Sequence, residues 1–319
     1  MAKQKFPTFL LKLLISVGLI AFFLWKIDLF RFLEAVRSTR IVYLLIGFVL
    51  FPLGQIVCAV KWQYLARALG VHRGLKPMVG LYFIGMFFNL FLPTGIGGDI
   101  TRGLYLNPDA GKARSFLSVL VERATGLLSM ILLASVVLLT RYGAALPDLL
   151  RYGFPVATFF LLVFLWFLPR LVGGTKTRMQ QLINRDLIVF WKKPQIAIIA
   201  IGYSVLIHCI LVAIHVCIAL ALSLPIPIPY HFVTIALASL ASLLPSFNGI
   251  GVRDGAYIYL LSRIGIEHAF ALLFSVLWFI IMTTSSLIGF VVYMTRGLSW
   301  VPATQVVDQP FLGDSHAEG

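Results

Sequence analysis

Long apolar runs are the feature that most limits how this chain can fold. They lie at about residues 9–27, 41–66, 115–140, 152–169, 195–222 and 268–295. Each run approaches or exceeds the roughly 20 residues that an α-helix needs to cross a hydrocarbon core about 30 Å thick. Only 12% of the 319 residues are charged, whereas a soluble domain is usually about a quarter charged. The sequence therefore predicts an all-α integral membrane protein that crosses the bilayer several times.

The surplus of basic residues fits the same class of protein. The chain has 26 Lys and Arg against 12 Asp and Glu, a formal net charge of +14. Lys and Arg are concentrated in the cytoplasmic loops of membrane proteins, and no nucleic-acid-binding motif accompanies them here. The three cysteines lie inside apolar runs with no paired spacing, so they indicate neither a disulfide framework nor a metal site. We expect no nucleic-acid partner, no metal and no cofactor.

Two similar segments interrupt the apolar sequence with a proline, glycines and charges. The first reads LPTGIGGDITRGLYL from Leu92, and the second reads LPSFNGIGVRDGAYIYL from Leu244. Proline ends a helix and glycine permits a tight reversal. Irregular backbone at membrane depth is tolerated only where protein buries it or where it lines a watery cavity. We therefore predict two re-entrant helical hairpins, at about 77–107 and 231–263; simple helix kinks are the alternative, because Gly and Pro are frequent in membrane helices.

The charges of the loops favour an inverted repeat. With two re-entrant hairpins, the six full transmembrane helices place the basic loop after Pro169 in the cytoplasm, as the positive-inside rule requires. Each half then has three crossings, so the second half is inserted upside down, as in many transporters. We predict a first repeat at 1–145, an inverted second repeat at 146–296 and a disordered cytoplasmic tail at 297–319. Both termini are expected on the cytoplasmic side of a bacterial or archaeal plasma membrane.

Charged residues at the two breaks and in the third long run form the candidate site. Glu122 and Arg123 lie about two turns into that run, where a charge costs about 2.5–3.5 kcal/mol on insertion scales and is usually functional. Adjacent helix positions do not face each other, so each residue should have its own partner. We hypothesise a buried polar network that joins this span to both hairpin tips. The alternative is a structural ion pair near the interface with snorkelling ends.

The candidate substrate-binding residues combine these charges with the residues that shape the tips. A helix that starts at a tip directs its positive end there, which favours an anion, and the aspartates at the tips are candidates to cap such helices. The asparagines beside the breaks are candidates to cap backbone groups or to contact a headgroup. The full set is Asn89, Pro93, Gly97, Asp99, Arg102, Glu122, Arg123, Pro245, Asn248, Gly251, Arg253 and Asp254.

Two histidines lie in the fifth long run. His208 and His215 are seven residues apart and share one helix face. Two turns rise about 10.5 Å, too far for one metal ion without other ligands, so we expect packed or hydrogen-bonded histidines. No nucleophile elbow, zinc motif or phosphate-binding loop is present. We expect that the chain is not an enzyme; a buried acid–arginine cluster that acts on a lipid phosphate is the weakest alternative.

The interrupted segments make the chain resemble a known family. FNLFLPTGIGGDITRGLYL, SVLVERATGLL and SLLPSFNGIGVRDGAYIYLL are similar to the flippase-like membrane domain of the lysylphosphatidylglycerol synthase transmembrane family. The resemblance covers nearly the whole chain. It implies an acidic residue where Asp99 and Asp254 stand, and an arginine where Arg102, Arg123 and Arg253 stand.

One departure from that family lies in the last span. Trp278 and Phe279 stand where the family often has a Tyr-Arg pair, so the role of that arginine is absent here or is taken by another residue. Some family members also have a soluble aminoacyl-transferase part, for which these 319 residues leave no room. The resemblance therefore implies lipid binding or translocation, not aminoacyl transfer.

Together these observations predict a flippase-like protein that binds an anionic lipid headgroup between the two hairpins and moves it between leaflets. The arginines would attract the phosphate in a bidentate manner, and the acids would hold the arginines in place. The lipid partner would be an anionic phospholipid or a polyprenyl-phosphate-linked lipid. Two alternatives stay open: an accessory subunit that presents a lipid to a separate glycosyl- or aminoacyl-transferase, and a coupled small-solute transporter.

Overall fold

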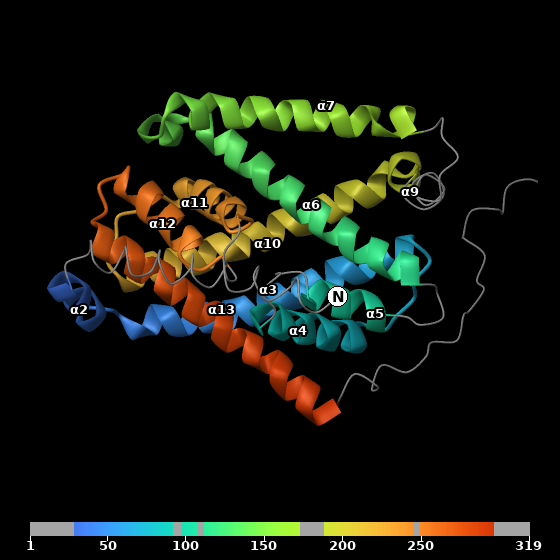
Figure 1. Cartoon of the computed structure of the whole chain (residues 1–319), viewed down its shortest axis with the longest axis horizontal. Helices are drawn as coiled ribbons and strands as arrows, with labels where there is room; N and C mark the ends of the chain where they lie inside the picture. Colours follow the sequence, from blue (N-terminus) through green and yellow to red (C-terminus); the bar gives the residue numbers. More distant parts are fainter. Residues whose placement is uncertain (1–28, 92–96, 107–111, 173–187, 245–248, 297–319) are drawn as a thin grey trace, which may run out of the picture.

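The computed structural model is helical throughout the residues that it describes, which are 29–91, 97–106, 112–172, 188–244 and 249–296 (Figure 1). Five helices in this part are long and apolar enough to cross a membrane, so the chain is a multi-pass membrane protein. They are α3 (Ile41–Ala68), α6 (Lys112–Leu138), α7 (Phe154–Val172), α10 (Pro194–Ala221) and α13 (His268–Arg296). Shorter elements connect them: α2 (Leu29–Arg37), α4 (Leu75–Phe91), α5 (Gly97–Tyr105), η1 (Arg141–Ala145), η2 (Leu149–Gly153), α9 (Ile188–Lys192), α11 (Ile228–Ala241) and α12 (Val252–Ser262).

The long helices lie where the apolar runs predict them, within a few residues at each end. The predicted first span at 9–27, the two hairpin tips and the tail at 297–319 lie outside the described residues, so the count of six spans stays a prediction. The two short apolar runs form α4 and α11, and each is followed by a second short helix against which it packs, α5 and α12 respectively. Two helices, α2 and α9, occupy segments for which the sequence predicts only a loop.

The packing of the helices follows a two-fold pattern. The central pair is α3 and α10, which have 28 residues each and pack against each other. On one side α4 packs on α13 and α5 packs on α6; on the other, α11 packs on α6 and α12 packs on α13. Each of these contacts has a counterpart when α3 to α6 are exchanged for α10 to α13. An inverted repeat would produce this pattern, while the opposite insertion of the two halves stays a prediction.

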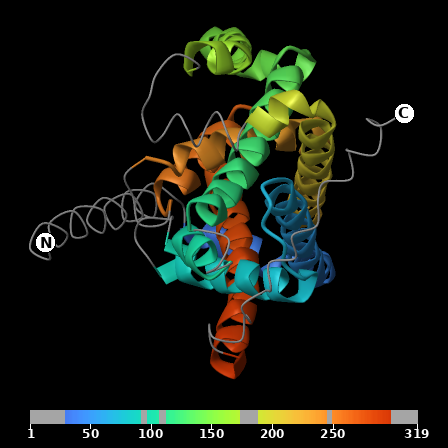
Figure 2. The same ribbon diagram turned by 90° about the vertical axis from the view of Figure 1, so that its right-hand side faces the viewer.

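Helix α7 lies at the edge of the bundle. It runs apart from α10 and α11 in Figures 1 and 2, and its contacts are chiefly with α6 and η2. Large apolar side chains cover its surface, among them Phe159, Phe160 and Trp166. In water such a surface would be unfavourable, but lipid tails are as apolar as these side chains. The exposure of α7 is therefore that of a helix in contact with lipid.

Helices α4 and α13 approach each other so closely that their backbones touch at a glycine. A Cβ atom on Gly289 of α13 would lie 2.0 Å from the carbonyl oxygen of Phe83 in α4. Membrane helices have no hydrophobic force to drive them together, so close backbone packing at small residues is a main source of their association. Gly289 thus fixes the position of the first hairpin helix against the last span.

We expect Gly289→Ala to lower the free energy of unfolding by about 1–3 kcal/mol, as overpacked sites do. The matched control is Gly202→Ala in α10, where an added Cβ would meet nothing within 4 Å; it should be neutral or stabilising, because alanine favours a helix more than glycine does. Thermal unfolding of both purified variants in detergent measures the difference. Equal stability of the two variants would contradict the close α4–α13 contact.

Candidate functional site

Helix α5 is held against α4 by a cap and by a pair of glycines. The side-chain oxygen of Asn89, near the end of α4, accepts a hydrogen bond of 2.7 Å from the backbone N–H of Gly98 in the first turn of α5. A Cβ on Gly98 would lie 1.8 Å from the carbonyl oxygen of Gly85, so only glycine fits there. Asn89 therefore caps the helix, and the charges of α5 are placed directly beside α4.

Arg102 of α5 is buried in the middle of this contact. Its guanidinium lies between the rings of Trp62 and Tyr82, 4.3 and 4.2 Å from their centroids, and only 1% of the residue is exposed. It donates hydrogen bonds to Glu122 at 3.0 Å and to Asp99 at 3.2 Å. A cation in an apolar bundle requires such partners, because an unpaired buried charge is very costly. Arg102 thus joins α3 and α4 to the third long span.

Glu122 has a second cationic neighbour that the sequence analysis did not identify. Lys61 of α3, 1% exposed, lies 3.7 Å from the Glu122 carboxylate. Its ammonium donates to the backbone carbonyl of Glu122 at 2.9 Å and to the Ser204 hydroxyl at 3.0 Å. The sequence did contain a sign that Lys61 is part of the site: it lies inside the predicted span at 41–66, and charged residues within a span usually have a function.

Arg123 has its own partner, as the geometry of a helix requires. Its Nη2 and Nε donate to the Asp99 carboxylate at 2.9 and 3.1 Å, while its neighbour Glu122 pairs with Arg102. The Arg123 side chain is 49% exposed, unlike the buried members. Five residues thus alternate in charge from the interior outward, and we call them the charged network: Lys61, Glu122, Arg102, Asp99 and Arg123.

The exposed end of the charged network borders a cavity of about 190 Å³. The cavity lies between α3, α4, α6 and α13, and Arg123 is the charged residue in its wall. The other lining residues are apolar, aromatic or neutral polar. They are Phe51, Gln55, Tyr82, Met86, Asn89, Leu90, Met282 and Ser286.

The second hairpin carries a separate group of polar contacts. Gly251 has φ +83° and precedes α12; its N–H donates to the Asp254 carboxylate at 2.8 Å, so Asp254 does cap this helix. Ser275 of α13 also donates to Asp254. Arg253 lies 3.5 Å from Asp254 and over the ring of Phe279, 5.2 Å from its centroid. Its Nε is buried and has no hydrogen-bond partner among the described residues.

The hypothesis of one network that joins the third span to both hairpin tips stays a prediction for the second hairpin, whose tip at 245–248 lies outside the described residues. Ion pairs join α6 to the first hairpin, but in the described residues none joins Arg253 or Asp254 to α6. The physical reason is the packing of α12 on α13, whose Ser275 and Phe279 take these side chains. Phe279 stands where the family often has the arginine of a Tyr-Arg pair. In this chain its ring packs under the guanidinium of Arg253.

Trp278, the other departure, belongs to an aromatic cluster between α3, α10 and α13. Its ring lies 4.5 Å from His215 and 5.5 Å from Phe51. His215 is fully buried and hydrogen-bonded, with Nε2 2.8 Å from the hydroxyl of Tyr257, and His208 lies 3.0 Å from the carbonyl oxygen of Gly126. The prediction that His208 and His215 are packed or hydrogen-bonded is confirmed.

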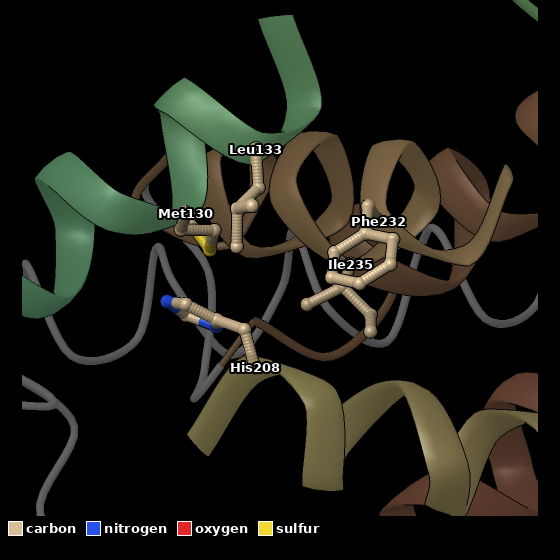
Figure 3. A pocket seen from close by; sticks show the side chains of 5 residues that line it. All are labelled: Met130, Leu133, His208, Phe232 and Ile235. Atoms are coloured by element: carbon tan, nitrogen blue, oxygen red, sulfur yellow. The ribbon is translucent and has the colours of Figure 1, made fainter. Parts of the chain in front are cut away.

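A second, narrower crevice is lined in part by His208. Figure 3 shows its side chain directed from α10 toward Met130 of α6, with Phe232 and Ile235 of α11 beside it. The crevice leaves no room for a water molecule. His208 lies fourteen residues after the first residue of α10, and Gln55, which lines the open cavity, lies fourteen residues after the first residue of α3. The two-fold pattern therefore pairs an open, charged cavity with a narrower, mostly apolar crevice.

The remaining predicted site residues are placed as follows. Gly97 is buried and is the first residue of α5. Pro93, Pro245 and Asn248 lie outside the described residues, so their predicted roles stay predictions. Within the residues that are described, no group of three or more His, Cys, Asp or Glu side chains could hold a metal ion.

Comparison with known proteins gives one family and one relative. The family model described as lysylphosphatidylglycerol synthase TM region matches residues 9–289. The UPF0104 membrane protein MJ1595 of Methanocaldococcus jannaschii is 27% identical over 126 residues, which cover 39% of this chain and 38% of that protein. The match thus spans well under half of the relative. No solved structure matches the chain.

The two network arginines should respond differently to lysine. Arg102→Lys loses the ring contacts and the paired donors, which lysine cannot reproduce, so we expect a loss of about 1–3 kcal/mol in the free energy of unfolding. Arg123→Lys also loses a bidentate pair, with Asp99, but water screens this exposed end, so the loss should be at most about 1 kcal/mol. Thermal unfolding in detergent compares the two variants. A larger loss of stability in Arg123→Lys would contradict the placement of Arg102 at the buried centre of the network and of Arg123 at its exposed end.

Proposed function

Because the chain belongs to the lysylphosphatidylglycerol synthase transmembrane family, we propose that it binds the anionic headgroup of a membrane lipid in the Arg123 cavity and moves that headgroup between leaflets. The observation that carries the proposal is a half-exposed arginine in the wall of a cavity whose other lining residues, among those that the structure describes, are uncharged. A charge kept at this position in a membrane protein is a functional residue by default.

The chemistry of Arg123 suits a phosphate. Asp99 engages Nε and Nη2, and the described residues give Nη1 no hydrogen bond. The guanidinium is therefore fixed on one edge while another donor remains available to a ligand. A planar guanidinium pairs with phosphate oxygens through parallel N–H donors, and Asp99 pre-orients it because the carboxylate itself is held by Arg102.

The walls of the cavity suit a lipid more than a free solute. Phe51, Met86, Leu90 and Met282 are apolar, and the large apolar surface of the protein faces lipid. A headgroup bound at Arg123 could leave its tails in the bilayer. We further propose a bacterial or archaeal plasma-membrane location with cytoplasmic termini, for which the distribution of Lys and Arg is the support.

An accessory subunit that holds a lipid for a separate transferase is the second candidate. The narrow crevice at His208 favours it, because the cavity at Arg123 has room for a ligand whereas its counterpart in the two-fold pattern has no room even for water. Holding a lipid needs one accessible cavity, whereas translocation needs access from both leaflets. A transport measurement separates the two candidates.

We expect wild-type protein in proteoliposomes to move fluorescent anionic lipids between leaflets, and Arg123→Ala to slow this at least about tenfold, because a hydrogen bond to a charged group contributes about 1.5–3 kcal/mol. The readout is the fraction of label that a membrane-impermeant reductant bleaches over time. The control is Arg141→Ala, the same change at an exposed arginine outside the network, and it should transport like the wild type.

Each outcome of this assay has one meaning. Equal transport by wild type and Arg123→Ala would remove the cavity from the mechanism. Binding of a labelled lipid without transport would support the accessory role. Absence of both binding and transport for anionic phospholipids and polyprenyl phosphates alike would refute a lipid function.

A further inference from the structure

The charged network contains one more cation than carboxylate, and from this we infer that the cavity accepts a headgroup with a single net negative charge, a phosphodiester monoanion. The inference rests on the proposed function and narrows its substrate class. Lys61, Arg102 and Arg123 are the cations, and Asp99 and Glu122 are the carboxylates. In the second hairpin, Arg253 and Asp254 pair with each other, so they do not change this balance.

The net charge of the network affects ligand binding because most of its members are buried. Lys61 and Arg102 are each 1% exposed and Glu122 is 4% exposed, so bulk water does not screen their charges. An uncompensated charge in such surroundings is costly, and ligands that neutralise it are favoured. Arg123 is the most exposed member and borders the cavity, so the excess positive charge is accessible to a ligand there.

The three common classes of lipid headgroup differ in what they do to this charge. A phosphodiester without other charges carries one negative charge and makes the site neutral. A zwitterionic headgroup brings no net charge and leaves the excess in place. A phosphomonoester carries about −1.5 to −2 at neutral pH, so it over-compensates and leaves an unpaired negative charge in the cavity.

The geometry of the exposed end suits the phosphodiester group itself, while the charge balance selects among the lipids that carry it. A phosphodiester has two non-bridging oxygens, which one guanidinium can engage through parallel N–H donors. Arg123 is the charged residue in the cavity wall, and the neutral donors beside it are Gln55, Asn89 and Ser286. The side-chain oxygen of Asn89 accepts the hydrogen bond from the N–H of Gly98, and this cap does not use the N–H₂ group of the same side chain.

Lys61 allows the charge count to be tested without altering the cavity. It is at the opposite end of the network from Arg123 and does not line the cavity; its contacts are with Glu122 and Ser204. Lys61→Met brings the network to a net charge of zero. The double variant Lys61→Met with Glu122→Gln returns it to one positive charge and leaves both arginines in place.

The experiment measures binding to the wild type and the two variants in nanodiscs by displacement of a fluorescent lipid. The probes are phosphatidylglycerol, phosphatidylcholine and, at pH 8, phosphatidic acid. We expect the wild type to prefer phosphatidylglycerol over each of the others by about tenfold or more, because phosphatidylcholine brings the same phosphodiester with an added cation and phosphatidic acid brings additional negative charge. Lys61→Met should lose the preference over phosphatidylcholine, and the double variant should regain it.

A matched control separates this effect from the overall charge of the protein. Lys76→Met makes the same chemical change at an exposed lysine of α4 and should keep the wild-type preference. Thermal unfolding shows whether each variant is folded. If Lys61→Met is unfolded, the wild-type ranking of the three lipids and the double variant still decide the matter.

Soluble dimethyl phosphate, added as a competitor, distinguishes this inference from the lipid proposal. Suppose that dimethyl phosphate binds the wild type, that Lys61→Met weakens this binding, and that no lipid binds. This outcome would support the monoanion site and refute the lipid function. An unchanged ratio of phosphatidylglycerol to phosphatidylcholine in folded Lys61→Met would overturn the inference while the lipid function stands. A wild-type preference for phosphatidic acid would also overturn it.

Discussion

The buried guanidinium of Arg102 is the constraint to which the rest of the site conforms. A cation without water needs several partners, and Arg102 obtains them from four helices: rings from α3 and α4, Asp99 from its own helix α5, and Glu122 from α6. Gly85 leaves space for its side chain, since a Cβ there would lie 2.8 Å from the Arg102 Cδ. Arg102 is therefore the centre of the site. It pairs with Glu122 and Asp99, and these carboxylates in turn bind Lys61 and Arg123.

The two halves of the protein use the same helix packing for different chemistry. Lys61 lies twenty residues after the first residue of α3, and the corresponding position of α10, also twenty residues on, is Ile214. Gln55 corresponds to His208 in the same way. The cavity beside the first hairpin therefore has the charged Arg123 in its wall, while its counterpart beside α11 is lined by Met130, Phe232 and Ile235 as well as His208. The two-fold pattern belongs to the backbone, and the side chains break it.

The sequence predicts the helices well and the contacts between them only in part. Long apolar runs leave few alternatives to a membrane helix, so the bounds of α3, α10 and α13 agree closely with the prediction. The separate partners of Glu122 and Arg123 also follow from helix geometry. Lys61 was missed because its meaning depends on which helix it faces. The separation of Arg253 from the charged network depends on the packing of α12 on α13, which no local pattern encodes.

The aromatic cluster around Trp278 has a consequence for the depth of the cavity. Along α3, the two cavity-lining residues Gln55 and Phe51 are four residues apart, which is about 6 Å, or a fifth of a hydrocarbon core about 30 Å thick. Phe51 lines the cavity and also contacts Trp278, which in turn packs on His215. Measured along this helix, the cavity is short and ends at packed aromatic rings. A polar group in the cavity would have to displace these rings before it moved past Phe51 along α3.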